Sequence, residues 1–126
     1  MKESIRKQDL SSEFYTSERC FIVEQSNSTD DETLSIARAR VEPGVTTRWH
    51  RLRKSAERYY ILSGIGRVEI GDLLAEDVTP GDVVIIPPMS RQRIANTGQE
   101  DLVFLALCTP PFTKDDYEDI DEPPVC

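Results

Sequence analysis

Short apolar segments separated by turn residues run through most of this chain, and this pattern restricts its fold more than any other feature. Eight segments between about residues 20 and 109 are expected to be strands: CFIVEQ, TLSIARARV, TTRWHRL, ERYYIL, GRVEI, DVVIIP, QRIAN and LVFLALC. Turn pairs such as Pro43-Gly44 and Pro80-Gly81 separate them. Almost no segment has the 3.6-residue period of an amphipathic helix. The sequence therefore predicts an all-β protein, an antiparallel sandwich or a small antiparallel β-barrel.

Length and charge restrict the class further. A chain of 126 residues is long enough for one hydrophobic core, and its formal net charge of -8 disfavours nucleic acid and anionic membranes as partners. No apolar run approaches the roughly 20 residues that cross a bilayer, and the first residues are charged where a signal peptide is apolar. Three widely separated cysteines are expected to be reduced thiols. We expect a single domain with a cytoplasmic location.

The chain divides into three parts. Residues 1–19 are expected to form an N-terminal extension, residues 20–109 the β-barrel, and residues 110–126 an acidic, proline-rich tail packed on the surface. Phe112 and Tyr117 are candidates for anchoring that tail, which would cover an otherwise free sheet edge. A partly disordered terminus is the alternative.

The chain's single histidine, His50, lies between Gly44 and Gly64, and Glu57 follows it by seven residues. An imidazole and a carboxylate near the ends of two neighbouring strands can share a metal ion or a substrate. The sequence around this candidate site is basic, with Arg48, Arg51, Arg53, Lys54, Arg58, Arg91 and Arg93. Arg48 either binds an anionic group in bidentate fashion or lies solvated at the rim.

Strand alternation predicts which neighbours share the site. Arg48 and Leu52 fall on the face of His50, and Tyr59 falls on the face of Glu57. If His50 points inward, these side chains do so too. Tyr59 is then a candidate general acid or a core residue.

Two glycine-bounded segments resemble the two motifs of the cupin superfamily. The first motif, G-x5-H-x-H-x3,4-E-x6-G, matches at Gly44, His50, Glu57 and Gly64, with Leu52 at the second histidine. The second motif, G-x5-P-x-G-x2-H-x3-N, matches at Gly81, Pro87 and Asn96, with Met89 at the glycine and Gln92 at the histidine. The chain looks like a small single-domain cupin of the isomerase-like group with a degenerate ligand set. The fold that this resemblance implies is a double-stranded β-helix, or jelly roll.

The resemblance also implies a site. One divalent metal ion would be held by His50, Glu57 and Gln92, and the alternative is a metal-free pocket in which these three side chains hydrogen-bond to one another. Catalytic roles would fall on His50, Glu57 and Tyr59, with Arg48 and Gln92 binding the substrate.

The sequence leaves two functions open. One is an enzyme of isomerase, epimerase or lyase type that acts on a sugar or a small carboxylate. The other is a non-catalytic ligand-binding or scaffolding dimer without metal. In both, the expected partner is a small polar or anionic organic ligand, and the expected assembly is a homodimer that covers the outward apolar residues Tyr60, Leu62, Val84 and Ile86.

Overall fold

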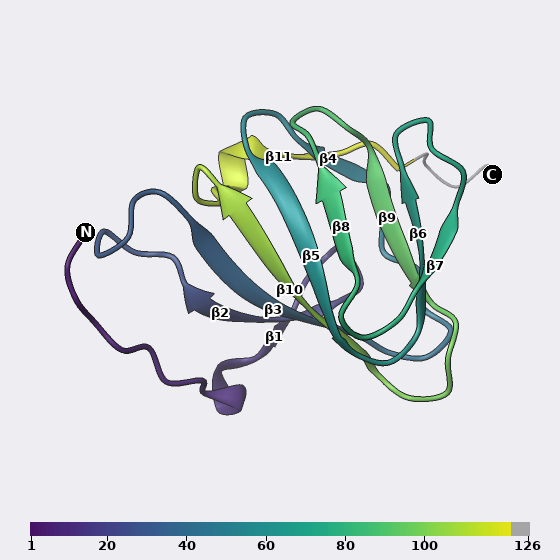
Figure 1. The fold of residues 1–126 in the computed structure, drawn as a ribbon, viewed down its shortest axis with the longest axis horizontal. Coiled ribbons are helices and arrows are strands. Elements are labelled where there is room, and N and C mark those ends of the chain that lie inside the picture. Colours follow the sequence, from purple (N-terminus) through teal and green to yellow (C-terminus); the bar gives the residue numbers. More distant parts are fainter. Residues whose placement is uncertain (122–126) are drawn as a thin grey trace.

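Two antiparallel sheets pack face to face in the computed structural model, which describes residues 1–121 (Figure 1). Sheet A has the order β1-β2-β3-β10-β5-β8 and sheet B the order β11-β4-β9-β6-β7. The strands are β1 (Phe14–Tyr15), β2 (Phe21–Ser26), β3 (Ser35–Val41), β4 (His50–Leu52), β5 (Ala56–Ser63), β6 (Gly66–Ile70), β7 (Glu76–Val78), β8 (Val83–Ile86), β9 (Gln92–Asn96), β10 (Leu102–Thr109) and β11 (Tyr117–Asp119). Two 3-10 turns, Leu10–Ser12 and Lys114–Asp116, are the helical elements of the described residues. The predicted all-β jelly roll is confirmed, as a sandwich of two sheets rather than one closed ladder.

Proline-glycine turns lead into the strands as the sequence predicts. Gly44 and Gly81 have φ angles of 79° and 95°, a region that glycine adopts at little cost. The Val45 amide donates to the Glu42 carbonyl at 3.2 Å, which closes the first turn, and an equivalent bond closes the second. Met89, at the motif's glycine position, has a φ of 70°, so the chain keeps the glycine-type backbone without the glycine.

One half of the interior is a packed hydrophobic core. Its side chains come from both sheets and include Val41, Ile61, Ile94 and Leu102, none of which is exposed to solvent. In β5 and β9 the buried positions alternate with more exposed ones, as the pleat requires, whereas the first three residues of β10 are all buried. Within residues 1–121, no helix has the length and apolar character needed to cross a membrane.

The outward face of β8 differs from the prediction by one residue. Val84 and Ile86 are buried, whereas Val83 and Ile85 are 55% and 69% exposed. The cause is the register with β5, in which Val84 lies opposite Tyr59 and therefore shares its inward face. Tyr60 and Leu62 point outward as predicted.

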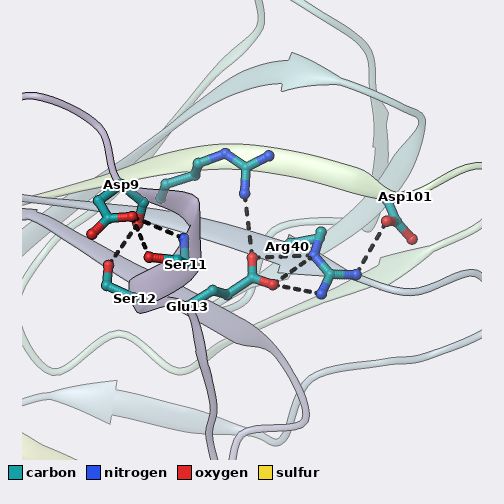
Figure 2. A network of polar contacts seen from close by, with 7 residues as sticks. Asp9, Ser11, Ser12, Glu13, Arg40 and Asp101 are labelled. Atoms are coloured by element: carbon teal, nitrogen blue, oxygen red, sulfur yellow. Dashed lines mark hydrogen bonds and ion pairs between the residues drawn. The ribbon is translucent and has the colours of Figure 1, made fainter.

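Polar contacts hold the N-terminal residues to the outer face of sheet A (Figure 2). Glu13 accepts from Arg40 at 2.6 Å and from Arg38 at 3.3 Å, and Arg40 also pairs with Asp101 at 3.1 Å. The Arg40 guanidinium lowers the pKa of the Glu13 carboxyl. This anchor lies directly before β1, which pairs with β2 as a hairpin, so part of the expected extension belongs to sheet A.

Part of the expected tail belongs to sheet B. Strand β11 pairs with β4, and Asp119 lies opposite His50 in that register. The Asp116 carboxylate accepts from the backbone amides of Lys54 and Ser55 at 2.6 and 3.0 Å, which fixes the approach to β11. Residues 122–126 of the predicted tail lie outside the described residues.

Candidate active site

A cavity of about 460 Å³ occupies the half of the sandwich that the core leaves open. Its walls are the inner faces of β2, β3, β5 and β10, the strands β4 and β11 opposite them, and the turn between β1 and β2. Five aromatic side chains line it: Phe14, Tyr59, Phe104, Phe112 and Tyr117. This volume is typical of sites for small organic molecules.

His50 opens β4 and reaches the cavity with a defined tautomer. Its Nδ1 atom lies 2.8 Å from the carbonyl oxygen of Arg48. Because a carbonyl can only accept, Nδ1 carries the proton and Nε2 of the neutral ring is left with a lone pair. The Tyr117 ring stacks on the imidazole at 5.3 Å between centroids. His50 therefore offers a fixed proton acceptor at the cavity wall.

Glu57, on β5, is the buried carboxyl of the site. Burial raises its pKa from 4.5 to about 7, although the nearby His50 and Gln92 act in the opposite direction. The Cys108 thiol donates to Oε2 at 3.6 Å, and Oε1 has no hydrogen-bond partner among the described residues. A carboxyl with this pKa can both donate and accept a proton near neutral pH.

Tyr59 and Gln92 form a buried pair behind Glu57. The Tyr59 hydroxyl donates to Gln92 Oε1, and burial raises the pKa of Tyr59 well above its usual value, so it stays protonated. Its ring packs on Phe104 at 4.5 Å between centroids. Gln92 lies opposite His50 in the pairing of β4 with β9. The structure thus brings together four of the predicted site residues.

Glu18 is a site residue that the sequence did not reveal. It lies in the turn between β1 and β2, where its Oε2 atom is 3.9 Å from His50 Nε2. Its carbonyl accepts from the Arg48 amide at 3.2 Å, and burial raises the pKa of its carboxyl. The sequence gives no signal for this turn, because the residue with the positive φ angle, 72°, is Arg19 and not a glycine or asparagine.

Arg48, predicted to bind substrate, is not brought into the site. Its guanidinium pairs with Asp119 at 2.8 Å and with Asp121 at 3.5 Å, in and after β11. Its backbone, which bonds His50 and Glu18, is what contributes to the site. The basic residues expected around the site are all absent from the lining of the cavity: Arg48, Arg51, Arg53, Lys54, Arg58, Arg91 and Arg93.

The donor set does not fit a divalent metal ion. Gln92 Oε1 already accepts from Tyr59, so this uncharged oxygen has only one lone pair left for a metal ion, and the NH₂ group does not bind metals. Leu52 has no donor atom. In the described part of the chain, no three His, Cys, Asp or Glu side chains form a group that could hold a metal.

Comparison with known proteins agrees with the motifs and the fold. The model of the cupin domain family matches residues 37–108, which is more than half of the chain. The chain belongs to the cupin family. An uncharacterized Methanocaldococcus jannaschii protein, MJ1618, is 37% identical to this cupin over 84 residues, covering 67% of the chain and 66% of the relative. A Thermococcus gammatolerans glucose-6-phosphate isomerase is 37% identical over 78 residues, covering 59% of the chain and 41% of the isomerase.

Solved structures extend the agreement to nearly the whole cupin. The nucleoside dehydratase Pac13 superposes with a TM-score of 0.75, covering 94% of this chain and 92% of Pac13. Its sequence identity of 17% means that this likeness shows the fold alone. The matched parts span less than two thirds of the two curated relatives. Glu18 lies outside the family match, whereas His50 and Glu57 lie within it.

Proposed function

We propose that this cupin is an enzyme that moves protons on a small polar organic molecule, in a reaction of isomerase, epimerase or lyase type. The observation that carries this proposal is the contact of His50 Nδ1 with the Arg48 carbonyl, which leaves Nε2 of the neutral ring free to accept a proton at the cavity wall beside two carboxyls. A base held in this way does not have to reorganise before it accepts a proton.

The geometry supports complementary roles for the two ends of the site. His50 Nε2 would remove a proton from a carbon next to a carbonyl or hydroxyl group. Protonated Glu57 would deliver a proton to the substrate oxygen, since its pKa of about 7 keeps a large protonated fraction near neutral pH. Tyr59 holds Gln92 in place, and the Gln92 amide lies near Glu57. Isomerisation and loss of water both need such a pair, and one curated relative is named as an isomerase.

Proton exchange tests this proposal without a known substrate. The protein would be incubated in D₂O with a panel of aldoses, ketoses, uronates and nucleosides, and ¹H NMR would follow exchange of carbon-bound protons or formation of an alkene. We expect one class of compound to exchange or eliminate. A compound that binds in the cavity and does neither would favour the non-catalytic binding module instead.

Metal content gives a second prediction. Because the donor set does not fit a divalent ion, protein purified without chelator should carry far less than one equivalent of any transition metal. Inductively coupled plasma mass spectrometry measures this content. Near-stoichiometric metal that is lost in His50→Ala would contradict the metal-free site. A surface variant, Glu42→Gln, serves as the control for adventitious binding.

A homodimer remains a prediction, and we propose the outer face of β5 and β8 as its interface. Tyr60, Leu62, Val83 and Ile85 are exposed there, and β8 is an edge strand of sheet A. Ile85→Lys should convert a dimer into a monomer at micromolar concentration, measured by light scattering after gel filtration. Leu74→Lys, at a residue that is 90% exposed, should leave the mass unchanged. A monomeric wild type would contradict the proposal.

A further inference from the structure

The charged side chains that line the cavity are mostly acidic. Glu18, Glu24 and Glu57 carry carboxyls there, and Lys114 and His50 are the only basic groups among the described lining residues. Lys114 and Glu24 are exposed, whereas Glu57 is buried and Glu18 is half-buried. The enclosed end of the cavity, next to His50, is therefore bounded by two carboxyls and no arginine.

The arginines that could have neutralised an anion are bound elsewhere. Arg48 pairs with Asp119 and Asp121, and Arg51 pairs with Glu118 at 2.8 Å. Arg93 pairs with Glu69 at 2.8 Å and stacks over Trp49. Arg58 donates to the Thr109 hydroxyl at 2.8 Å. None of these side chains lines the cavity, so an anionic ligand there would have no guanidinium to bind.

The position of Glu18 is fixed from several sides. Within the turn, the Thr16 amide and hydroxyl both donate to the Cys20 carbonyl at 2.9 Å. Across the cavity mouth, the Glu18 carbonyl accepts from Arg48, and the Arg19 side chain donates to the Thr46 carbonyl at 3.4 Å. Before β1, Glu13 is held by two arginines (Figure 2). The turn therefore joins the edge of sheet A to the segment before β4.

An anion placed beside these carboxyls would be strongly disfavoured. Above pH 7, where Glu57 is mostly ionised, it would bring like charges together in a partly desolvated space, and the site would have to take up protons to relieve the repulsion. A neutral ligand avoids this repulsion. Its hydroxyl groups can donate to Glu18 and to the unpartnered Oε1 of Glu57, and its apolar faces can pack on Tyr59 and Tyr117.

We propose that Glu18 makes the cavity select an uncharged, hydroxyl-bearing ligand against the phosphorylated form of the same molecule. This inference rests on the proposed small-molecule function and narrows its substrate class. Of the expected polar or anionic ligand it keeps the polar class and excludes the anionic one, and it departs from the sugar phosphate that the name of the Thermococcus relative describes.

Matched pairs of probes test the inference. Uridine and uridine 5′-monophosphate, and glucose and glucose 6-phosphate, would be titrated against the protein at pH 8 by NMR. We expect at least one neutral member to bind about tenfold or more tightly than its phosphate, and Glu18→Gln to reduce that ratio several-fold by removing a nearby charge. Glu42→Gln removes one charge at an exposed position that does not line the cavity and should leave the ratio unchanged.

Three results would overturn the inference. They are the lack of any preference for the neutral member in both pairs, a preference for a phosphate, and an unchanged ratio in a folded Glu18→Gln protein. The wild-type ratio stands as a test even if that variant does not fold. Turnover of glucose 6-phosphate would remove this inference and keep the proposed function. Selective binding of a neutral probe without proton transfer would keep this inference and contradict the proposed function.

Discussion

Replacing His50 with glutamine (H50Q) should lower the rate of proton exchange or elimination by about 10²–10⁴-fold, because an amide cannot act as a base. His50 is the only imidazole of the chain, so no second histidine can take over its role. Glutamine has a similar length and remains polar, and the loss should therefore fall on the rate constant more than on the affinity for the ligand. NMR in D₂O would measure the rate, and titration the affinity.

Arg51→Gln is the matched control for H50Q. Arg51 follows His50 on β4 but does not line the cavity, and its side chain pairs with Glu118. Its replacement should change the rate by less than about threefold, since this partly exposed ion pair contacts neither the cavity nor the proposed proton-transfer groups. A reaction that proceeds at the wild-type rate in H50Q would remove His50 as the base and with it the proposed mechanism.

Replacing Glu57 with glutamine should change how the stability of the protein depends on pH. Burial raises the pKa of Glu57 from 4.5 to about 7 in the folded protein. Between these values the folded state binds more protons than the unfolded state, so the free energy of unfolding falls as pH rises. The stabilisation by this proton is complete below pH 4.5 and is lost as pH passes through about 7. The shift corresponds to about 3 kcal/mol.

Urea denaturation at several pH values measures this effect. Between pH 4.5 and pH 8, the free energy of unfolding of Glu57→Gln should rise by about 3 kcal/mol relative to that of the wild type, because the amide has no charge to bury. Glu18, whose pKa is also raised by burial, should leave some dependence of the same sign in the variant. Glu42→Gln, at an exposed position, should follow the wild-type curve. Parallel curves for the wild type and Glu57→Gln would show that Glu57 does not titrate in this way.

The buried carboxyl of the site destabilises the fold. Glu57 has an oxygen without a hydrogen-bond partner in the described part of the chain, and its charge is desolvated. Such a group is kept in a protein interior at a cost in stability, and perturbed carboxyls of this kind are frequent in active sites. Glu13 should contribute a pH dependence of stability of the opposite sign, since Arg40 lowers its pKa and its contribution is therefore lost as the pH falls.

The candidate site was predictable where it depends on strand alternation. His50, Glu57 and Tyr59 share the interior because each follows the period of two within its own strand. Counting by two from His50 also places Arg48 on the inward face. However, β4 begins only at His50, so strand alternation does not apply to Arg48. The outward pair on β8 was wrong by one residue because apolar side chains occupy four successive positions there, and alternation then has no signal.

By itself, the sequence determined the class of fold, the two proline-glycine turns and the inward direction of the imidazole and its partner carboxyl. These depend on local rules, namely the period of a strand and the φ angles that glycine adopts. Only the tertiary structure decided that Glu18 joins the site and that the arginines leave it. Both depend on pairing between segments distant in the chain, such as the Arg48 amide with the Glu18 carbonyl and the Arg48 side chain with Asp119. No local pattern encodes which of several possible charged partners an arginine will meet.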